Sequence, residues 1–208
     1  MTTTQQVRTE GRKLTRKGEQ RRNEILEASA ELFDRCGYHQ ATIALIAEEI
    51  GTTKANVYHY FKAKHDILFA SHEAWIEDLI SRFDEDIAPL ENAEEQVRMV
   101  IQHVVDIVAE RRSQVRVYFE YLRELPDDLR RLADQRRDEY TERVEGILAR
   151  GMANGDVRDM PLRVTTFGLF GIVNWTYQWY RPGGAQTPEQ VADQIFEMFW
   201  RGIAAEPR

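Results

Sequence analysis

Residues 42–64, TIALIAEEIGTTKANVYHYFKAK, set the organisation of the N-terminal part of the chain. Ile43, Ile46 and Ile50 recur at helical spacing, which predicts a helix with one apolar face. Gly51 is predicted to end that helix, because glycine readily adopts the left-handed conformation of a sharp stop. The apolar face requires a partner elsewhere in the chain.

A second short helix is predicted directly after this stop. Thr52 and Thr53 supply a hydroxyl that can cap it, and its apolar side chains, Val57 and Phe61, point to one side. The other side carries Lys54, Ala55, Asn56, Tyr58 and His59. A face with no acid, one fixed positive charge and several hydrogen-bonding side chains suits a groove of DNA.

A helix over residues 21–36, ended by Gly37, is predicted to cover this pair. Its apolar stripe consists of Ile25, Leu26, Ser29, Leu32, Phe33 and Cys36. We expect it to receive Ile46, Ile50, Val57 and Phe61 and so to close a three-helix module. Cys36 is the single cysteine and excludes an internal disulfide framework and a cysteine-based zinc site. We expect it to be a small, buried apolar side chain.

Charge is distributed unevenly along the chain. The net charge is −7, yet residues 1–22 hold seven basic and two acidic side chains, so this segment carries +5 and the other 186 residues carry −12. A basic arm on an acidic body is typical of arms that follow phosphates or enter a minor groove. A solvated tail is the alternative for residues 1–15. Arg16 to Arg22, which include Arg21 and Arg22, are the better candidates for phosphate contact.

Length and composition describe an ordinary globular protein. The chain has 208 residues, of which 42% are hydrophobic, enough for one large or two small domains. It has no apolar run of about 18 residues or more, and residues 1–22 lack the apolar core of a signal peptide. We therefore expect neither a membrane span nor a secretory peptide, and a location in the cytoplasm.

The stretch TIALIAEEIGTTKANVYHYFKAKHDIL resembles the DNA-binding signature of the tetracycline-repressor (TetR) family, T-x-x-x-I-A-x-x-x-G-V-[ST]-x-x-x-[LIV]-Y-x-[HY]-F-x-x-K-x-x-[LI]. The resemblance covers about residues 20–70. Nearly every anchor of the pattern is present: Thr42, Ile46, Ala47, Gly51, Thr53, Val57, Tyr58, Tyr60, Phe61, Lys64 and Leu68. Thr52 departs from it, because a hydroxyl stands where the pattern usually has valine.

The resemblance implies roles for individual residues. Carried over by position, Thr42, Tyr58 and Lys64 would contact phosphates, whereas Lys54, Ala55, Asn56 and His59 would face base edges, and Tyr60 would touch DNA as in some members. Thr53 belongs to the same candidate surface. From chemistry alone, Lys54 can donate to guanine and Asn56 can pair with adenine or donate to a phosphate, so base and phosphate roles both remain open.

The rest of the chain is also predicted to be helical, over about residues 64–86, 93–112, 113–124, 126–153, 162–180 and 187–203. The fold class is all-α, with about nine helices. The predicted organisation is a basic flexible arm at 1–20, a helix-turn-helix DNA-binding domain at 21–66, and a ligand-binding and dimerisation domain at 67–208. His103, Asp106 and Glu110 have a spacing that metal ligands can share, but it is equally that of a polar helix face, so no metal or cofactor is predicted.

Aromatic and methionine side chains in the body suggest a cavity for a ligand, although their helical spacing is equally that of a core. The candidate lining residues are Met99, His103, Tyr118, Phe119, Leu122, Arg123, Arg137, Tyr140, Phe167, Phe170, Asn174 and Tyr177. The TetR resemblance implies a small hydrophobic effector. The run GLFGIVNWTYQWYRPGG is similar to members that respond to acyl-CoA thioesters, whose anionic part arginines can meet.

The last two apolar helices have two possible uses, a homodimer interface or a closed internal core. The resemblance favours a dimer that reads a palindrome, with Gly171, Trp175, Trp179, Ile195, Phe199 and Trp200 as candidate interface residues. The sequence thus predicts a cytoplasmic, ligand-responsive repressor that binds double-stranded DNA and is not an enzyme. The alternative is an α-helical ligand-binding protein or enzyme with an incidental helix-turn-helix module.

Overall fold

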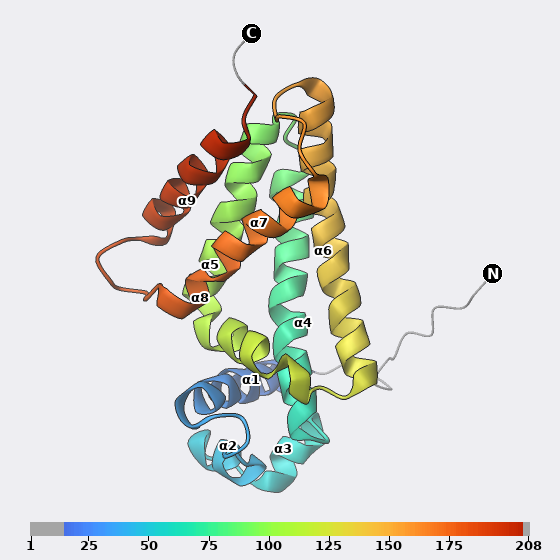
Figure 1. Ribbon diagram of the computed structural model, residues 1–208. Coiled ribbons are helices and arrows are strands. Elements are labelled where there is room, and N and C mark those ends of the chain that lie inside the picture. The colour runs from blue at the N-terminus through green and yellow to red at the C-terminus, as the bar shows by residue number, and fades with distance from the viewer. Residues whose placement is uncertain (1–14, 206–208) are drawn as a thin grey trace, which may run out of the picture.

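The structure, a computed structural model, describes residues 15–205. Within this range the regular elements are helices, apart from an isolated β-bridge between Val157 and Ala204. Figure 1 shows α1, α2 and α3 gathered at one end, with α4, α5 and α6 running side by side away from them. The prediction of an all-α fold with a small helical head and a larger helical body is confirmed.

Helix α1 spans Arg16–Cys36 and begins five residues earlier than predicted. Its start is set by Thr15, whose Oγ1 accepts a hydrogen bond from the Gly18 amide at 3.3 Å. Residues 16–20 are therefore helix, and the prediction of a flexible arm over 1–20 is wrong for them. The remainder of that arm, residues 1–14, lies outside the described residues.

The helix pair matches its predicted form. Helix α2 spans Ile43–Glu49 and α3 spans Lys54–Tyr60, with Thr42 and Thr53 as their caps. Gly51, in the turn between them, has φ +61°, the left-handed conformation that favours glycine. The module's core includes Ile25, Phe33, Ile46, Val57 and Phe61. Cys36 and Ile50 are only partly buried, contrary to expectation, because both sit at the end of a helix.

Helix α4, Lys64–Arg82, leaves the module and enters the body as one continuous helix, followed by the π-helical turn η1, Phe83–Ile87. Helix α5, Ala93–Tyr121, replaces the two helices predicted over 93–124 and bends at Arg111, near the predicted division. A short 3-10 turn η2, Leu122–Glu124, leads to α6, Asp127–Asn154.

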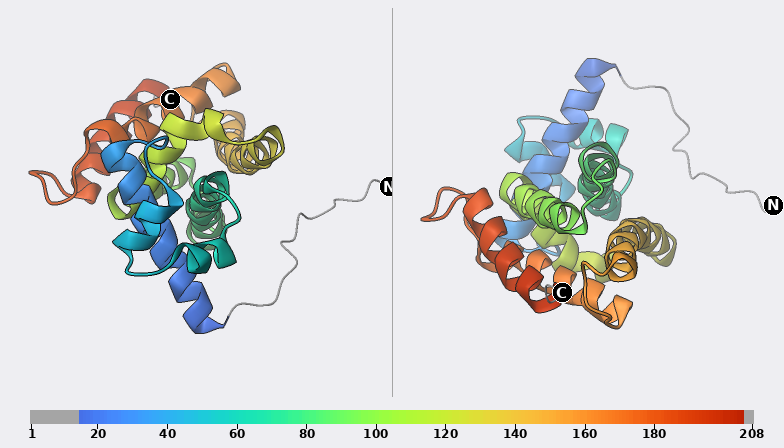
Figure 2. Two further views of the ribbon diagram at one scale, coloured as in Figure 1. Left: turned by 90° about the horizontal axis from the view of Figure 1, so that it is seen from below. Right: turned by 90° about the horizontal axis from the view of Figure 1, so that it is seen from above.

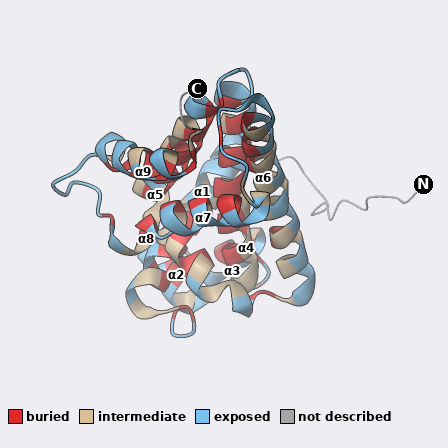
Figure 3. Ribbon diagram, turned by 45° about the horizontal axis from the view of Figure 1, so that its top comes forward, coloured by how far each residue is buried: buried red, intermediate tan, exposed pale blue. Residues whose placement is uncertain are grey.

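The C-terminal elements are α7, Leu162–Asn174, the single turn α8, Thr176–Trp179, and α9, Pro188–Ile203. Helix α7 crosses the body, and α9 lies against α5 (Figures 1 and 2). The capping box predicted for α9 is present, with Thr187 and Gln190 bonding each other's backbone at 3.0 and 3.3 Å. The buried residues of Figure 3 run from the head into the body, so both parts share one continuous core.

No helix within residues 15–205 is long and apolar enough to cross a membrane.

Candidate nucleic-acid interface and ligand site

The exposed face of α3 is the first candidate site. Lys54, Ala55, Tyr58 and His59 are exposed, and the Tyr58 side chain is 51% accessible although α3 is anchored through fully buried Val57. The packing of Val57 therefore orients the predicted residues outward. The hydroxyls of Thr42 and Thr53 accept their cap bonds from Leu45 and Asn56 amides at 3.2 Å, which leaves each O–H proton free for an external acceptor.

Thr52, the departure from the family pattern, has a definite structural role. Its Oγ1 accepts a hydrogen bond from Asn56 Nδ2 at 2.7 Å. The bond orients the Asn56 amide across the start of α3 and leaves its carbonyl oxygen as an acceptor. An oriented acceptor suits the amino group of a base better than a phosphate oxygen, which only accepts.

Lys64 does not occupy the position that the resemblance implied. Its Nζ donates to the carbonyl oxygens of Tyr38 and Ala41 at 2.6 and 3.2 Å and lies 4.1 Å from the centre of the Tyr38 ring. Partial burial lowers the pKa of Lys64. The ammonium therefore ties α4 to the α1–α2 connection instead of pointing outward. Lys62, which the sequence reasoning did not select, is the exposed cation at this end of α3.

The two predicted arginines of α1 are also engaged internally. Arg21 donates to Glu24 at 2.6 Å and to the Ile50 carbonyl at 3.3 Å, so it joins α1 to the end of α2. Arg22 lies over the Phe61 ring at 5.3 Å, and burial lowers the pKa of this arginine. In the first turn of α1, Arg16 and Lys17 are exposed instead, and at its other end Arg35 is exposed and paired with Glu49.

A depression of about 530 Å³ lies between the start of α1 and α3. Its lining comes from the start of α1 and from α3 and comprises Thr15, Lys17, Gly18, Gln20, Arg21, Glu24, Asn56 and Tyr60. Three of these residues, Arg21, Asn56 and Tyr60, were predicted to contact DNA. The structure therefore brings part of the predicted DNA-binding set to one concave surface beside the exposed face of α3.

A buried aromatic cluster in the body is the second candidate site. Phe119 stacks on Tyr177 at 5.3 Å between ring centres, and Tyr118 stacks on His72 at 4.1 Å. Trp75 contacts both Tyr118 and Phe119. Tyr118, Phe119 and Tyr177 were predicted to line a cavity, whereas His72 and Trp75 were missed because α4 was interpreted only as a connection.

This cluster contains polar atoms that have no hydrogen bond within the described residues. His72 is fully buried; its Nδ1 lies 3.5 Å from Glu73 Oε1 without a hydrogen bond, and its Nε2, Trp75 Nε1 and the Tyr118 hydroxyl have no hydrogen-bond partner among the described residues. Such groups cost about 1–3 kcal/mol each when buried without a partner. Burial lowers the pKa of His72 and raises the pKa of Tyr118 to about 12, so both are neutral near pH 7. A ligand with polar atoms would satisfy them.

The other predicted ligand residues do not all join this cluster. Tyr140 packs against Phe83 and Phe170 in a second aromatic group, and burial raises its pKa. His103 lies near Asp86, at 3.4 Å, because it is on the half of α5 that faces η1. Met99, Leu122 and Asn174 are partly buried.

Two predictions for this site are corrected by exposure. Phe167 is 50% accessible on the outer face of α7, and Arg123 is exposed on η2, so neither side chain faces the body core. Arg137 is paired with Asp134 at 2.6 Å on α6 and also lies near the Tyr118 hydroxyl, where its charge partly offsets the rise in pKa that burial causes, so its predicted role stays a prediction.

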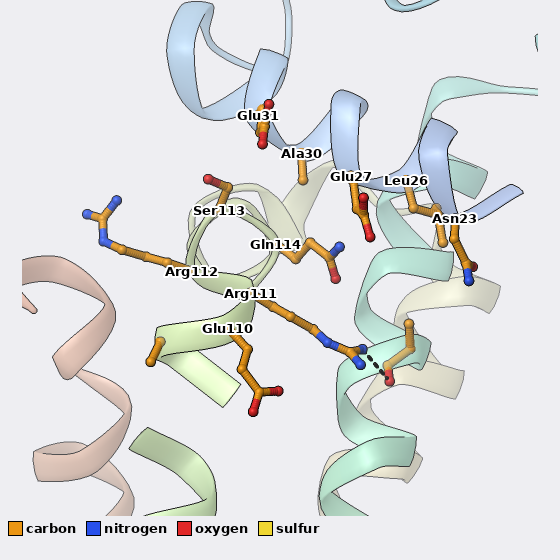
Figure 4. Close-up of a pocket in the computed structure, with 12 residues that line it drawn as sticks. Asn23, Leu26, Glu27, Ala30, Glu31, Glu110, Arg111, Arg112, Ser113 and Gln114 are labelled. Carbon is orange, nitrogen blue, oxygen red and sulfur yellow. Dashed lines mark hydrogen bonds between the residues drawn. The ribbon is translucent and has the colours of Figure 1, made fainter. Parts of the chain in front are cut away.

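A cavity of about 630 Å³ lies elsewhere, between α1, α4 and the bend of α5 (Figure 4). None of the predicted ligand residues lines it. Its walls are mostly polar and include Glu27, Gln114 and Arg111, whereas the predicted cavity was apolar.

The predicted dimer residues fall into two groups. Trp175 and Trp179 are about half accessible and Gly171 is exposed, but Ile195 and Phe199 are buried inside the protomer, where α9 packs against α5. Trp200 is partly buried and stacks on Phe196 at 5.9 Å. The exposed apolar surface also contains residues that were not predicted: Val164, Ile172 and Met198.

A short exposed recognition helix on a three-helix head, joined to a larger helical body, defines a helix-turn-helix DNA-binding protein with a separate regulatory part. The family comparisons agree. Residues 25–70 match the model described as bacterial regulatory proteins, tetR family, and residues 90–203 match that of the tetracyclin repressor-like C-terminal domain. The chain belongs to the TetR family and is a DNA-binding transcriptional regulator.

Two named bacterial regulators are similar to this chain over most of its length. It is 28% identical over 182 residues to the fatty acid metabolism regulator protein of Bacillus subtilis, covering 86% of this chain and 94% of that protein. It is 25% identical over 188 residues to the transcriptional repressor KstR2 of Rhodococcus jostii, covering 89% and 92%.

Solved structures with the same fold include the ketosteroid regulator KstR2 of Mycobacterium tuberculosis. The TM-score is 0.83 at 23% identity, with 89% of this chain and 96% of that chain covered. AibR, solved in complex with isovaleryl coenzyme A and operator DNA, has a TM-score of 0.77 at 27% identity, with 86% and 97% covered.

Proposed function

We propose that this chain is an effector-responsive repressor that binds a palindromic operator as a homodimer. The observation that carries the proposal is the outward face of α3, where Lys54, Tyr58 and His59 are exposed while Val57 anchors the helix. A helix of seven residues reads only a few base pairs, so two copies related by a two-fold axis supply the length of a specific site.

Removal of side chains from this face tests the proposal. Lys54→Ala should weaken operator binding about 5- to 150-fold, because a good base contact contributes about 1–3 kcal/mol. Tyr58→Phe should weaken it about fivefold, because a hydrogen bond from the phenol to a phosphate contributes about 1 kcal/mol. The operator can be selected from random duplexes, and affinity measured by gel shift. Arg150→Ala on exposed α6 is the control and should bind as the wild type does. Wild-type affinity in both test variants would contradict the proposed reading face.

The outer face of α7 supports the proposed dimer. Val164, Phe167 and Trp175 are 71%, 50% and 58% accessible, and a Cβ at Gly168 or Gly171 would meet nothing within 4 Å. The small residues let the backbone of a second helix approach closely, and the apolar neighbours would be covered by it.

We also propose that the effector binds the buried aromatic cluster of α4, α5 and α8 and that it is an acyl-CoA thioester. The unsatisfied polar atoms of His72, Trp75 and Tyr118 support a ligand that is apolar but carries hydrogen-bonding groups, as a thioester does. AibR with isovaleryl coenzyme A and the fatty acid regulator of B. subtilis support this class. On this proposal the chain has a regulatory and no catalytic role.

A thermal-shift series with acyl-CoAs of increasing chain length, followed by operator release with every compound that binds, tests the effector. If the effector lowers the operator affinity about 100-fold, the coupling free energy between the two sites is about 2.7 kcal/mol, which is an ordinary value. Trp75→Ala should reduce acyl-CoA binding and leave the operator affinity of the free protein unchanged. Failure of every acyl-CoA to stabilise the protein would contradict the effector class.

A further inference from the structure

Three successive side chains at the bend of α5 contact three different elements. The bend is centred on Arg111, whose φ and ψ of −134° and 36° are not helical. Arg111 contacts α4, donating to the Ala74 carbonyl at 3.2 Å and pairing with Asp78 at 3.1 Å. The next two residues of α5 contact α1, and one of them also contacts the end of α8.

Arg112 makes the double contact. Its Nε donates to the carbonyl oxygen of Tyr180, directly after α8, at 3.2 Å. Its Nη1 lies 3.7 Å from Asp34 Oδ2 in the last turns of α1. The side chains of Arg112 and Asp34 are each only 16% accessible, so water screens the ion pair weakly. One guanidinium therefore links the DNA-binding head to the C-terminal part of the body.

Asp34 is held by further groups of the same segment. Ser113 Oγ donates to its Oδ2 at 3.2 Å, and Arg116 Nη1 lies 2.8 Å from its Oδ1. Two arginines and one hydroxyl of α5 thus surround one carboxylate: Ser113 makes a hydrogen bond to it, and Arg112 and Arg116 contribute positive charge. These contacts tie the C-terminal end of α1 to this segment of α5.

The middle of α1 has a buried apolar side, but part of its surface borders a cavity. The cavity of about 630 Å³ separates part of its face from α5 at the bend, with Asn23, Glu27 and Glu31 on one side and Ala109 and Gln114 on the other (Figure 4). In Figure 4, Arg112 points away from this cavity, whereas Arg111 reaches across to α4. Close packing resists motion, so the cavity gives α1 room to swing about its anchor at Asp34.

The other end of this link lies next to the aromatic cluster. Tyr177 of α8, which stacks on Phe119, is three residues before Tyr180. A ligand that separates these two rings displaces α8 and with it the carbonyl that Arg112 holds. We infer that Arg112 is the positioning residue that couples α8 to α1, so that the head changes direction when α8 moves. This inference rests on the proposed function.

Hydrogen–deuterium exchange tests the coupling without any effector, because coupling between two sites is reciprocal. The probe is a duplex selected from a random pool by the wild-type protein. Binding of this duplex should change amide exchange in residues 176–180 of the wild type, far from DNA. In Arg112→Met that change should disappear, while the duplex still protects α3. A merely structural Arg112 would alter exchange equally with and without DNA.

Two further variants keep the result interpretable. Arg112→Lys keeps the charge, but its compact ammonium lacks the planar fork whose Nε and Nη1 face the two partners, so it should also fail to transmit the change. Arg150→Met, an exposed arginine of α6, should behave as the wild type does. If Arg112→Met does not fold, shown by its melting curve, Arg112→Lys decides the question.

The outcomes separate the two ideas. If wild-type protein selects no duplex, the proposed function fails and the coupling falls with it. If the wild type binds DNA but residues 176–180 do not respond, or if Arg112→Met and Arg112→Lys transmit the change in full, the coupling through Arg112 is overturned and the DNA-binding function stands.

Discussion

Lys54 and Lys64 show how differently two lysines of one motif can be used. Lys54 is exposed at the start of α3, whereas the Lys64 ammonium is held by two main-chain carbonyls and by the Tyr38 ring. The carbonyls belong to the connection between α1 and α2, so Lys64 supplies two of the hydrogen bonds of that connection. The Lys54 ammonium is therefore available for the proposed contact with DNA, whereas the Lys64 ammonium is held within the protein.

Lys64→Met should consequently destabilise the protein. The substitution leaves the Tyr38 and Ala41 carbonyls without their donor, at a cost of about 1–3 kcal/mol. Chemical denaturation of the variant measures this loss, and Lys54→Met is the control that should melt as the wild type does. A Lys64→Met protein that is as stable as the wild type but binds DNA poorly would restore the phosphate role for Lys64.

His72 makes stability depend on pH. Burial lowers its pKa in the folded state below the ordinary value of 6.5. As pH falls through 6.5, His72 is therefore protonated in the unfolded chain before it is protonated in the folded protein. The contribution of this group to the free energy of unfolding is highest above pH 6.5 and decreases as pH falls toward the folded-state pKa. His103 has a pKa lowered in the same direction and adds to the effect.

His72→Phe keeps an aromatic ring against Tyr118 but cannot be protonated. Between about pH 7.5 and 5 its melting temperature should fall less than that of the wild type, and differential scanning calorimetry at constant ionic strength measures both slopes. His59→Phe, on the exposed face of α3, should follow the wild-type slope. Parallel slopes for wild type and His72→Phe would refute the buried neutral state of His72.

Among the elements, α7 has two faces with different uses. Thr165, Leu169 and Val173 are buried against the body, whereas Val164, Phe167 and Trp175 face outward. Glycine within a helix costs about 0.5–1 kcal/mol relative to alanine. A Cβ at Gly168 or Gly171 would meet nothing within 4 Å in the protomer, so packing inside the protomer does not require glycine at either position, whereas a closely packed partner helix would.

Gly171→Glu tests the outer face of α7. The new side chain has free space within the protomer, so folding should be preserved, but two copies would bring two like charges together at a close helix contact. The dimer dissociation constant should rise at least about tenfold, as a single buried unpaired charge costs several kcal/mol. Sedimentation equilibrium measures it, with Gln135→Glu on exposed α6 as the control. An unchanged constant would place the interface elsewhere.

At the scale of the whole molecule, the acidic body and the basic N-terminal segment oppose each other in DNA binding. Residues 1–22 carry +5 and the remainder −12, so specific binding depends on local phosphate contacts and not on net charge. Arg16 and Lys17 are exposed in the first turn of α1, and we expect them to extend the proposed DNA-binding surface beyond α3.

Operator affinity should therefore fall steeply with salt. A protein that makes about six to ten phosphate contacts loses about 10³–10⁵ in affinity between 50 and 200 mM salt. Fluorescence anisotropy at several salt concentrations gives the slope of the logarithm of the binding constant against the logarithm of the salt concentration. In a variant with both Arg16→Ala and Lys17→Ala, this slope should be shallower by about 0.9 for each phosphate that is no longer neutralised. Replacement of Arg130 and Arg131 on α6 is the control. An identical slope in the double variant would exclude these side chains from phosphate binding.

Local signals in the sequence accounted for much of the head and several helix ends. Gly51, Thr53 and the Thr187–Gln190 box act on neighbouring residues, so their effect is readable without the fold. Apolar periodicity likewise predicted the core positions of α2 and α3, because the period of a helix depends only on its own backbone. The predicted outward face of α3 followed from these same local signals, whereas the roles expected of Thr42, Tyr60 and Lys64 came from the resemblance to the TetR family.

Contacts between residues distant in sequence were decided by the tertiary structure alone. The Lys64 ammonium donates to the carbonyl oxygen of Tyr38, 26 positions away. Ile195 is buried and Trp175 is exposed, although both are apolar residues of predicted interface helices. The convergence of α5 on Asp34 and the unsatisfied nitrogens of His72 are equally invisible in a local pattern. Periodicity identifies the apolar face of a helix, but only packing determines whether that face meets the core, a ligand or another subunit.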